Sequence, residues 1–93
     1  RQAQPPHISA LRERGLWIYG TAASAPASLW ETDLTGPCCI IVGSEGEGMS
    51  RLVRESCDLL VSIPMKGEIS SLNASAAAAV LLYEALRQRE AER

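Results

Sequence analysis

Small and polar side chains that could bind a ligand or take part in a reaction lie between Ile63 and Ser75. Ser70, Ser71 and Asn73 carry hydroxyl or amide groups, and a stretch rich in alanine and leucine follows them. Residues of these types cap helix N-termini, where backbone N–H groups have no partner inside the helix. We therefore expect a loop between a strand and a helix that can offer backbone donors and small polar side chains to a ligand.

A second candidate loop is glycine-rich and has the sequence GSEGEG, from Gly43 to Gly48. Glycines let a backbone approach a ligand closely because they have no side chain. The loop fits neither the Walker fingerprint, because no Gly-Lys-Ser follows, nor the Rossmann fingerprint, because Arg51 replaces the third glycine. Alone it is either a flexible turn or a binding loop, and a phosphate-binding nucleotide enzyme is disfavoured.

The pattern of apolar and capping residues predicts the strands and helices that position these loops. Strands are predicted at 16–20, 38–43 and 58–63, and helices at 8–15, 50–55 and 72–89. Stretch 21–28 is expected to be a loop, stretch 29–37 to be irregular, and strand 38–43 to be covered on both faces. Gly15 should end the first helix, and Ser50 should cap the second. The alternation predicts an α/β domain with a mainly parallel sheet, where ligands bind at the carboxyl ends of strands.

Length, charge and cysteine content narrow the class of protein. A chain of 93 residues with 46% hydrophobic and 22% charged residues forms one domain at most and is not disordered. A net charge of −2 gives no global basic field, so any attraction to RNA must be local. Cys38, Cys39 and Cys57 fit no metal spacing and no even disulfide framework, which favours a reducing cytoplasm and no metal. The sequence contains no long uncharged apolar run, so no membrane segment is predicted.

Five stretches resemble a known family. Residues 43–48 after a buried strand, 63–65 (IPM) and 71–75 (SLNAS) before an alanine-rich helix resemble motifs two and three of the SpoU family. These are RNA ribose 2′-O-methyltransferases of the SPOUT, or trefoil-knot, superfamily. Residues 16–22 (LWIYGTA) and 33–37 (DLTGP) further resemble the branch that methylates a guanosine ribose in 23S ribosomal RNA.

The resemblance implies a SPOUT-type α/β trefoil knot, with S-adenosylmethionine as cofactor, RNA as substrate and a homodimer as the working form. Residues 1–7 are expected to be a linker or frayed end, and 8–93 the C-terminal part of the catalytic domain. The family's first motif, which holds an asparagine and an arginine, has no counterpart here. Alternatives are a noncatalytic knotted module that binds the cofactor or RNA, and 2′-O-methylation of tRNA.

The resemblance also implies roles for individual residues. The cofactor-binding positions are Gly43, Gly48, Ile63, Met65 and Leu72, with Met65 at the adenine, and the catalytic or site-shaping positions are Glu45, Ser71 and Asn73. A purely structural interpretation of these residues is also open, because Ser71 and Asn73 can be simple helix caps and Glu45 can be a solvated acid. Helix 72–89 is apolar nearly all round, which fits burial in the core and at a dimer interface. The arginines at its end, Arg87 and Arg89, are expected to complement the helix dipole.

Overall fold

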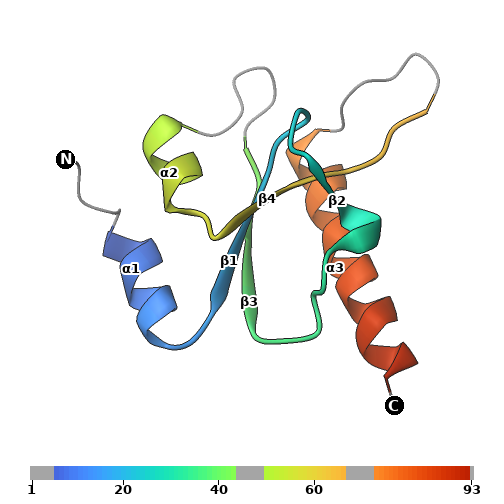
Figure 1. Cartoon of the computed structure of the whole chain (residues 1–93), viewed down its shortest axis with the longest axis horizontal. Helices are drawn as coiled ribbons and strands as arrows, with labels where there is room; N and C mark the ends of the chain where they lie inside the picture. Colours follow the sequence, from blue (N-terminus) through green and yellow to red (C-terminus); the bar gives the residue numbers. More distant parts are fainter. Residues whose placement is uncertain (1–5, 44–49, 67–72, 93) are drawn as a thin grey trace.

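A four-stranded parallel sheet forms the centre of the computed structural model, which describes residues 6–43, 50–66 and 73–92. The strand order is β2-β4-β1-β3, with α1 and α2 on one side of the sheet and α3 on the other (Figure 1). The strands are β1 (Trp17–Thr21), β2 (Ala27–Ser28), β3 (Cys38–Ile41) and β4 (Leu59–Ser62). The helices are α1 (Pro6–Glu13), the short 3₁₀ helix η1 (Leu29–Glu31), α2 (Arg51–Ser56) and α3 (Ala74–Ala91).

The central strand is β1, which pairs with β3 on one side and β4 on the other. Its residues Ile18 and Tyr19 are buried on opposite faces, as the alternation of a strand requires. The Asp58 side chain accepts a hydrogen bond from the Ile18 N–H at 2.6 Å, and the Asp58 N–H donates to the Ile18 carbonyl at 2.7 Å. Arg12 of α1 forms an ion pair with Asp58 at 3.4 Å and donates to the Ser56 carbonyl. These contacts fix α1 and the start of β4 against β1.

The main hydrophobic core lies between the sheet and α3. It consists of residues from both layers and from the segment between β2 and β3, namely Tyr19, Leu29, Leu34, Val61, Leu81 and Ala85. The Tyr19 hydroxyl donates to the Asp33 carbonyl at 2.7 Å, which gives this buried polar group a partner. Burial of these side chains is the main force that holds α3 on the sheet.

The predicted strands and helices are confirmed, with bounds shifted by up to about two residues, as fraying helix ends and assignment differences allow. Gly15 ends α1 in the left-handed region at φ 88°, and the Leu16 and Gly15 N–H groups donate to the Leu11 and Arg12 carbonyls. This is a Schellman C-cap. Ser50 caps α2 by accepting from the Val53 N–H at 3.3 Å, as predicted.

Three local expectations were wrong. Stretch 21–28 contains β2, because Ala27 and Ser28 pair with β4. Stretch 29–37 is not merely irregular, since it contains η1 and supplies Leu29 and Leu34 to the core. Strand β3 is not covered on both faces, because it lies at the end of the sheet order and all four residues are only half-buried.

Helix α1 begins at Pro6, so the expected linker 1–7 extends too far. The α/β class with a parallel sheet flanked by helices is confirmed. The loops that the resemblance assigns to the knot include residues 44–49 and 67–72, which lie outside the described residues. No helix in the described part of the chain is long and apolar enough to cross a membrane.

Candidate functional site

The candidate site lies at the edge of the sheet where the strands end. Because β1, β3 and β4 are parallel, their carboxyl ends meet at one edge, at the top of Figure 1. Strand β3 leads through Val42 to Gly43, and β4 leads directly to Ile63. The N-terminus of α3 lies at the same edge, so Asn73 is also brought there.

Sheet register gives the spacing of the two strand exits. Gly20 pairs with Ile41, and Thr21 pairs with Val61. In the sheet order β3 and β4 lie on either side of β1, so their exits are separated by two strand spacings, about 10 Å. Gly43 follows the end of β3 by two residues, and Ile63 follows β4 directly. Both residues are half-buried, so a ligand of moderate length could touch the backbone of both.

Asn73 caps α3, as predicted. Its Oδ1 accepts a hydrogen bond from the Ala76 N–H at 2.8 Å, and its carbonyl accepts from the Ala77 N–H at 2.9 Å. The Asn73 side chain is exposed, and its Nδ2 has no hydrogen-bond partner among the described residues. The cap itself therefore uses only the side-chain oxygen of Asn73 and not its amide donor.

An apolar groove begins beside the exit of β4. Ile63, Pro64 and Met65 form one wall, and η1 and α3 form the others. The groove has a volume of about 660 Å³ and is lined by Leu29, Trp30, Ile63, Pro64, Met65, Ala79, Val80, Tyr83 and Glu84. Trp30 and Tyr83 are 68% and 72% exposed. The predicted position of Met65 in an apolar wall is thus compatible with the structure.

Glu84 is the charged group of this groove, and the sequence reasoning missed it. Its residue is 6% exposed, and its carboxylate accepts two hydrogen bonds from Arg87, both 2.8 Å, and one from Gln88 at 2.9 Å. The hydrogen bonds from Arg87 and then Gln88 lower the pKa of Glu84 to about 2. The carboxylate is therefore charged and engaged near neutral pH, which suits a structural anion rather than a proton acceptor. An acid with Arg three and Gln four residues later in an apolar helix was the available signal.

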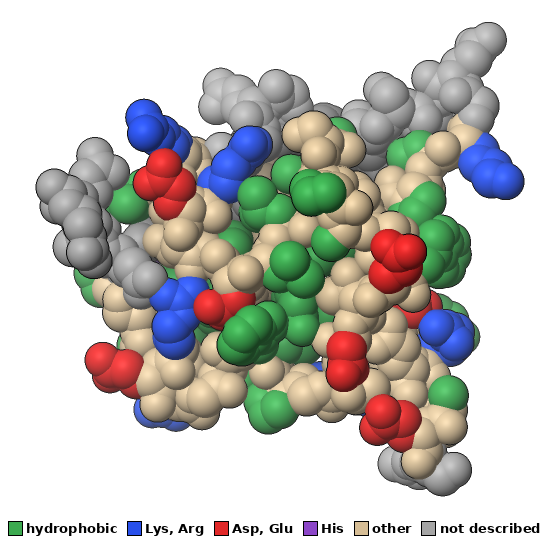
Figure 2. Space-filling model, in the orientation of Figure 1, with side chains coloured by type: hydrophobic (Ala, Val, Ile, Leu, Met, Phe, Trp, Pro, Cys, Tyr) green, Lys and Arg blue, Asp and Glu red, His purple; other side chains and the backbone are tan. Residues whose placement is uncertain are grey.

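The remaining titratable groups give little support for other chemistry. Burial raises the pKa of the Cys39 and Cys57 thiols, which keeps them protonated near neutral pH. Among the described residues no three His, Cys, Asp or Glu side chains form a group that could hold a metal ion, and the expectation of a metal-free site stays a prediction. On the face in Figure 2, acidic and basic side chains are interspersed around the periphery, and this face of the described residues shows no broad basic patch.

Of the eight predicted site residues, the structure describes Gly43, Ile63, Met65 and Asn73, and among these Ile63 and Met65 line the same groove. The other four, Glu45, Gly48, Ser71 and Leu72, lie outside the described residues. Their roles stay predictions.

Comparison with known proteins identifies relatives of this chain. The chain is 57% identical over 86 residues to a 23S rRNA (guanosine-2′-O-)-methyltransferase RlmB of Pseudomonas syringae, a match that covers 92% of this chain and 34% of that protein. The RlmB of Vibrio cholerae is 52% identical over 86 residues, which cover 92% of this chain and 35% of that relative. The chain thus spans about a third of the length of the curated relatives it matches.

Solved structures share the fold. The SpoU methyltransferase AviRb from Streptomyces viridochromogenes, in complex with the cofactor AdoMet, matches with a TM-score of 0.81 and 40% identity over 92% of this chain and 35% of its own. The A. aeolicus TrmH/SpoU tRNA modifying enzyme matches with a TM-score of 0.84 and 35% identity over 99% of this chain and 47% of its own. The model of the SpoU rRNA Methylase family matches residues 5–83, so the chain belongs to the SpoU rRNA methylase family.

Proposed function

We propose that the chain is the C-terminal, cofactor-binding part of an RNA methyltransferase. The enzyme transfers a methyl group from S-adenosylmethionine to a ribose 2′-hydroxyl of guanosine in 23S ribosomal RNA. The observation that carries this proposal is the identity of 57% with a protein named for that reaction, over 92% of the chain. The convergence of two strand exits and a helix N-terminus at one sheet edge supports it.

The described residues fit the expected cofactor. Gly43 and Ile63 would present backbone groups from two strand exits, and Met65 would contact the adenine from the wall of the groove. Asn73 would donate from its Nδ2 while its Oδ1 keeps the helix cap. The bound cofactor supplies an activated methyl group that already carries the sulfonium charge, so a metal is not needed.

These residues bind and orient rather than move protons. In-line methyl transfer depends on positioning, which half-buried backbone at two strand exits can provide. Neither Asn73 nor the backbone at Gly43 and Ile63 is a base, and Glu84 is already engaged with Arg87 and Gln88. The proton of the 2′-hydroxyl therefore passes to a substrate phosphate or to a base other than these residues.

A homodimer is part of the proposal. Helix α3 buries Ala77, Leu81 and Ala85 against the sheet, yet its outer surface is also apolar. Its large exposed apolar side chains are Val80, Leu82, Tyr83 and Leu86, and Trp30 stands beside them across the groove. A helix that is apolar nearly all round is normally buried, and a second copy of the chain would cover this surface. We place the enzyme in the cytoplasm, since its relatives are bacterial enzymes named for ribosomal RNA.

A second candidate is 2′-O-methylation of tRNA. Its support is structural similarity to the A. aeolicus tRNA modifying enzyme, at 35% identity, and to a structure titled for 2-OH methylation of C/U34 on tRNA, at 33% identity. The relatives named for 23S rRNA are 52–57% identical, which favours ribosomal RNA.

The test is methylation of unmodified 23S rRNA and of tRNA by the full-length protein with labelled S-adenosylmethionine, followed by mass spectrometry of the nucleosides. Label on 2′-O-methylguanosine from 23S rRNA is expected. Label in tRNA alone would establish the second candidate. Saturable cofactor binding without label in either RNA would mean a noncatalytic module.

A further inference from the structure

The two ends of α3 lie at opposite edges of the sheet, and its C-terminal end carries a dense polar anchor. The Gln88 side-chain Nε2 donates to the Thr32 carbonyl at 2.8 Å, and its Oε1 accepts from the Leu34 N–H at 2.7 Å. Thr32 and Leu34 are themselves buried. One amide side chain therefore holds both a backbone donor and a backbone acceptor of a distant segment.

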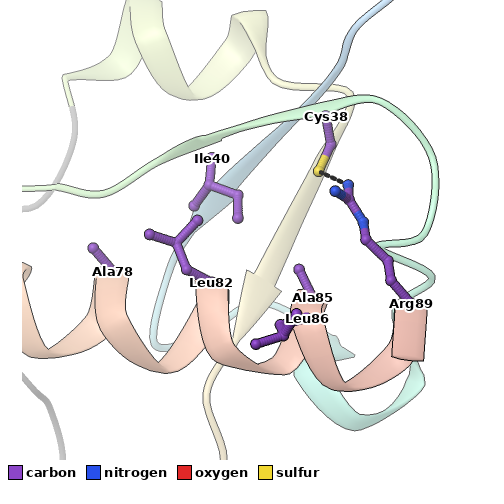
Figure 3. A pocket seen from close by; sticks show the side chains of 7 residues that line it. All are labelled: Cys38, Ile40, Ala78, Leu82, Ala85, Leu86 and Arg89. Carbon is purple, nitrogen blue, oxygen red and sulfur yellow. Dashed lines mark hydrogen bonds between the residues drawn. The ribbon is translucent and has the colours of Figure 1, made fainter. Parts of the chain in front are cut away.

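Arg89 extends this anchor toward β3. Its Nε donates to the Leu34 carbonyl at 3.2 Å, and its Nη2 donates to the Gly36 carbonyl at 2.8 Å. Figure 3 shows the Arg89 side chain leaving the end of α3 and reaching Cys38, the first residue of β3, where its Nη2 lies 3.8 Å from the Sγ. We call the contacts of Gln88 and Arg89 with residues 32–38 the C-terminal clamp.

The clamp joins the far ends of the two elements that form the candidate site. Segment 32–38 leads into β3, which ends just before Gly43. Helix α3 begins directly after its N-cap Asn73 and carries the clamp residues near its C-terminal end. Strand β3 leads to Gly43, and helix α3 follows Asn73. These two elements are therefore hydrogen-bonded to each other at the edge of the sheet opposite the site.

The middle of α3 is held by apolar contacts of a different kind. Ala77, Leu81 and Ala85 face the sheet, and two of the three are small. Apolar contacts are non-directional, and alanines offer little surface that interlocks, so they resist sliding along the helix axis weakly. Hydrogen bonds to fixed backbone groups are directional, with optimal distances near 2.9 Å. The clamp is thus the contact best suited to fix how far α3 extends along the sheet.

We propose that Gln88 and Arg89 are positioning residues for the cofactor site, since the clamp sets the axial position of α3 and hence of Asn73 relative to Gly43. The inference rests on the proposed function for its cofactor readout. It concerns residues remote from the ligand, which act only through the helix and the strand.

The test compares Gln88→Leu with Arg87→Leu. Arg87 lies on the same helix turn and bonds to Glu84, but its described contacts do not reach segment 32–38. By titration calorimetry, Gln88→Leu is expected to weaken S-adenosylmethionine binding about 10-fold, because small misplacements of a site are costly. Arg89→Lys keeps the charge but loses the two-pronged geometry, so a smaller loss is expected. Arg87→Leu should bind as the unmodified chain does.

The variant Ile8→Ala separates the effect of lost stability from the effect of lost positioning. It removes most of a buried side chain on α1, on the other side of the sheet. This variant should lower the denaturation midpoint at least as much as Gln88→Leu, yet leave the affinity of the folded protein unchanged. Equal weakening by Ile8→Ala, or normal binding by Gln88→Leu, would overturn the proposal.

Hydrogen exchange tests the clamp without any cofactor. Gln88→Leu should reduce protection of the Ala76 and Ala77 amides, at the far end of α3, more than that of the Tyr19 amide in β1. A uniform reduction would contradict a positioning role. Absence of cofactor binding by the unmodified chain would count against the proposed function, and the exchange ratio would still decide the clamp.

Discussion

The two ends of the sheet differ in how they are built. At the amino ends of the strands, the C-terminal clamp forms a dense set of hydrogen bonds of 2.7–3.2 Å. At the carboxyl ends, Asn73 caps α3 with one side-chain hydrogen bond, and the first turn of the helix consists of alanines and Ser75. Among the described residues, the side-chain hydrogen bonds that anchor α3 to segment 32–38 are therefore concentrated away from the candidate site. Among the described residues, the site end carries mostly small side chains, which leave room for a ligand.

The largest expected change in stability comes from the middle of α3, which lies between the clamp and the candidate site. Leu81 is buried in the main core, so Leu81→Ala should lower the free energy of unfolding by about 2–5 kcal/mol. Urea denaturation followed by circular dichroism measures this. The exposed neighbour Leu82 provides the control, since Leu82→Ala at low protein concentration should change stability by no more than about 0.5 kcal/mol. Similar losses from both variants would mean that the described core is wrong.

The next effect separates the two ends through a pair of glycines. Gly43→Val places a branched side chain at the strand exit, and overpacking of about 1–3 kcal/mol corresponds to a loss of cofactor affinity of about 5- to 150-fold. Gly36 lies at the opposite end, where a Cβ would meet no atom within 4 Å. Gly36→Ala adds only this Cβ and keeps the carbonyl that accepts from Arg89, so its calorimetric titration should match the unmodified chain. An equal loss in both variants would refute the assignment of the site to the Gly43 end.

A third prediction uses pH to probe the anchored end. The folded pKa of Glu84 is about 2, below its ordinary value of 4.5, so its contribution to stability is present above about pH 4.5 and is lost as pH falls toward 2. Glu84→Gln should cost about 1–3 kcal/mol at pH 7, as expected for hydrogen bonds to a charged group. Denaturation curves of both proteins between pH 7 and pH 2 should show this gap closing. A gap independent of pH would show that the carboxylate charge is not the source.

The smallest effect asks whether Asn73 is more than a cap. Asn73→Ala should cost about 1 kcal/mol of stability by removing the cap, whereas Asn73→Asp keeps an N-cap oxygen and should cost little. Asp lacks the Nδ2 donor, so both variants should weaken S-adenosylmethionine binding in calorimetry if the amide serves the site. Normal binding by Asn73→Asp would reduce Asn73 to a structural cap.

Local signals explain what the sequence could predict. Apolar runs identified the three longer strands, and Gly15, Ser50 and Asn73 marked helix ends correctly because capping depends on a few neighbouring residues. A parallel sheet then requires the strand exits at Gly43 and Ile63 to share an edge. That half of the site followed from pattern and topology.

Long-range pairing explains what was missed. Strand β2 is only Ala27 and Ser28, and it exists because β4 pairs with it, with the Ser62 hydroxyl donating to the Ala27 carbonyl at 3.1 Å. Leu34 is an isolated apolar residue among polar ones, so no periodicity marks it as core. Arg89 was expected to complement the helix dipole, whereas it also bonds to backbone more than 50 residues earlier in the chain. Side-chain contacts at such separation leave no local pattern.

The parallel register also determines when the sheet can form during synthesis. Trp17 has its strand partner at Cys38 and Tyr19 at Leu59, so β1 gains neither neighbour until much later parts of the chain exist. Ala27 likewise waits for Val61. Chains dominated by such distant pairings fold slowly, since loop closure is costly before any contact rewards it. Within this chain β1 therefore has neither strand neighbour until β3 has been synthesised, and the four-stranded sheet can form only after β4 has been synthesised.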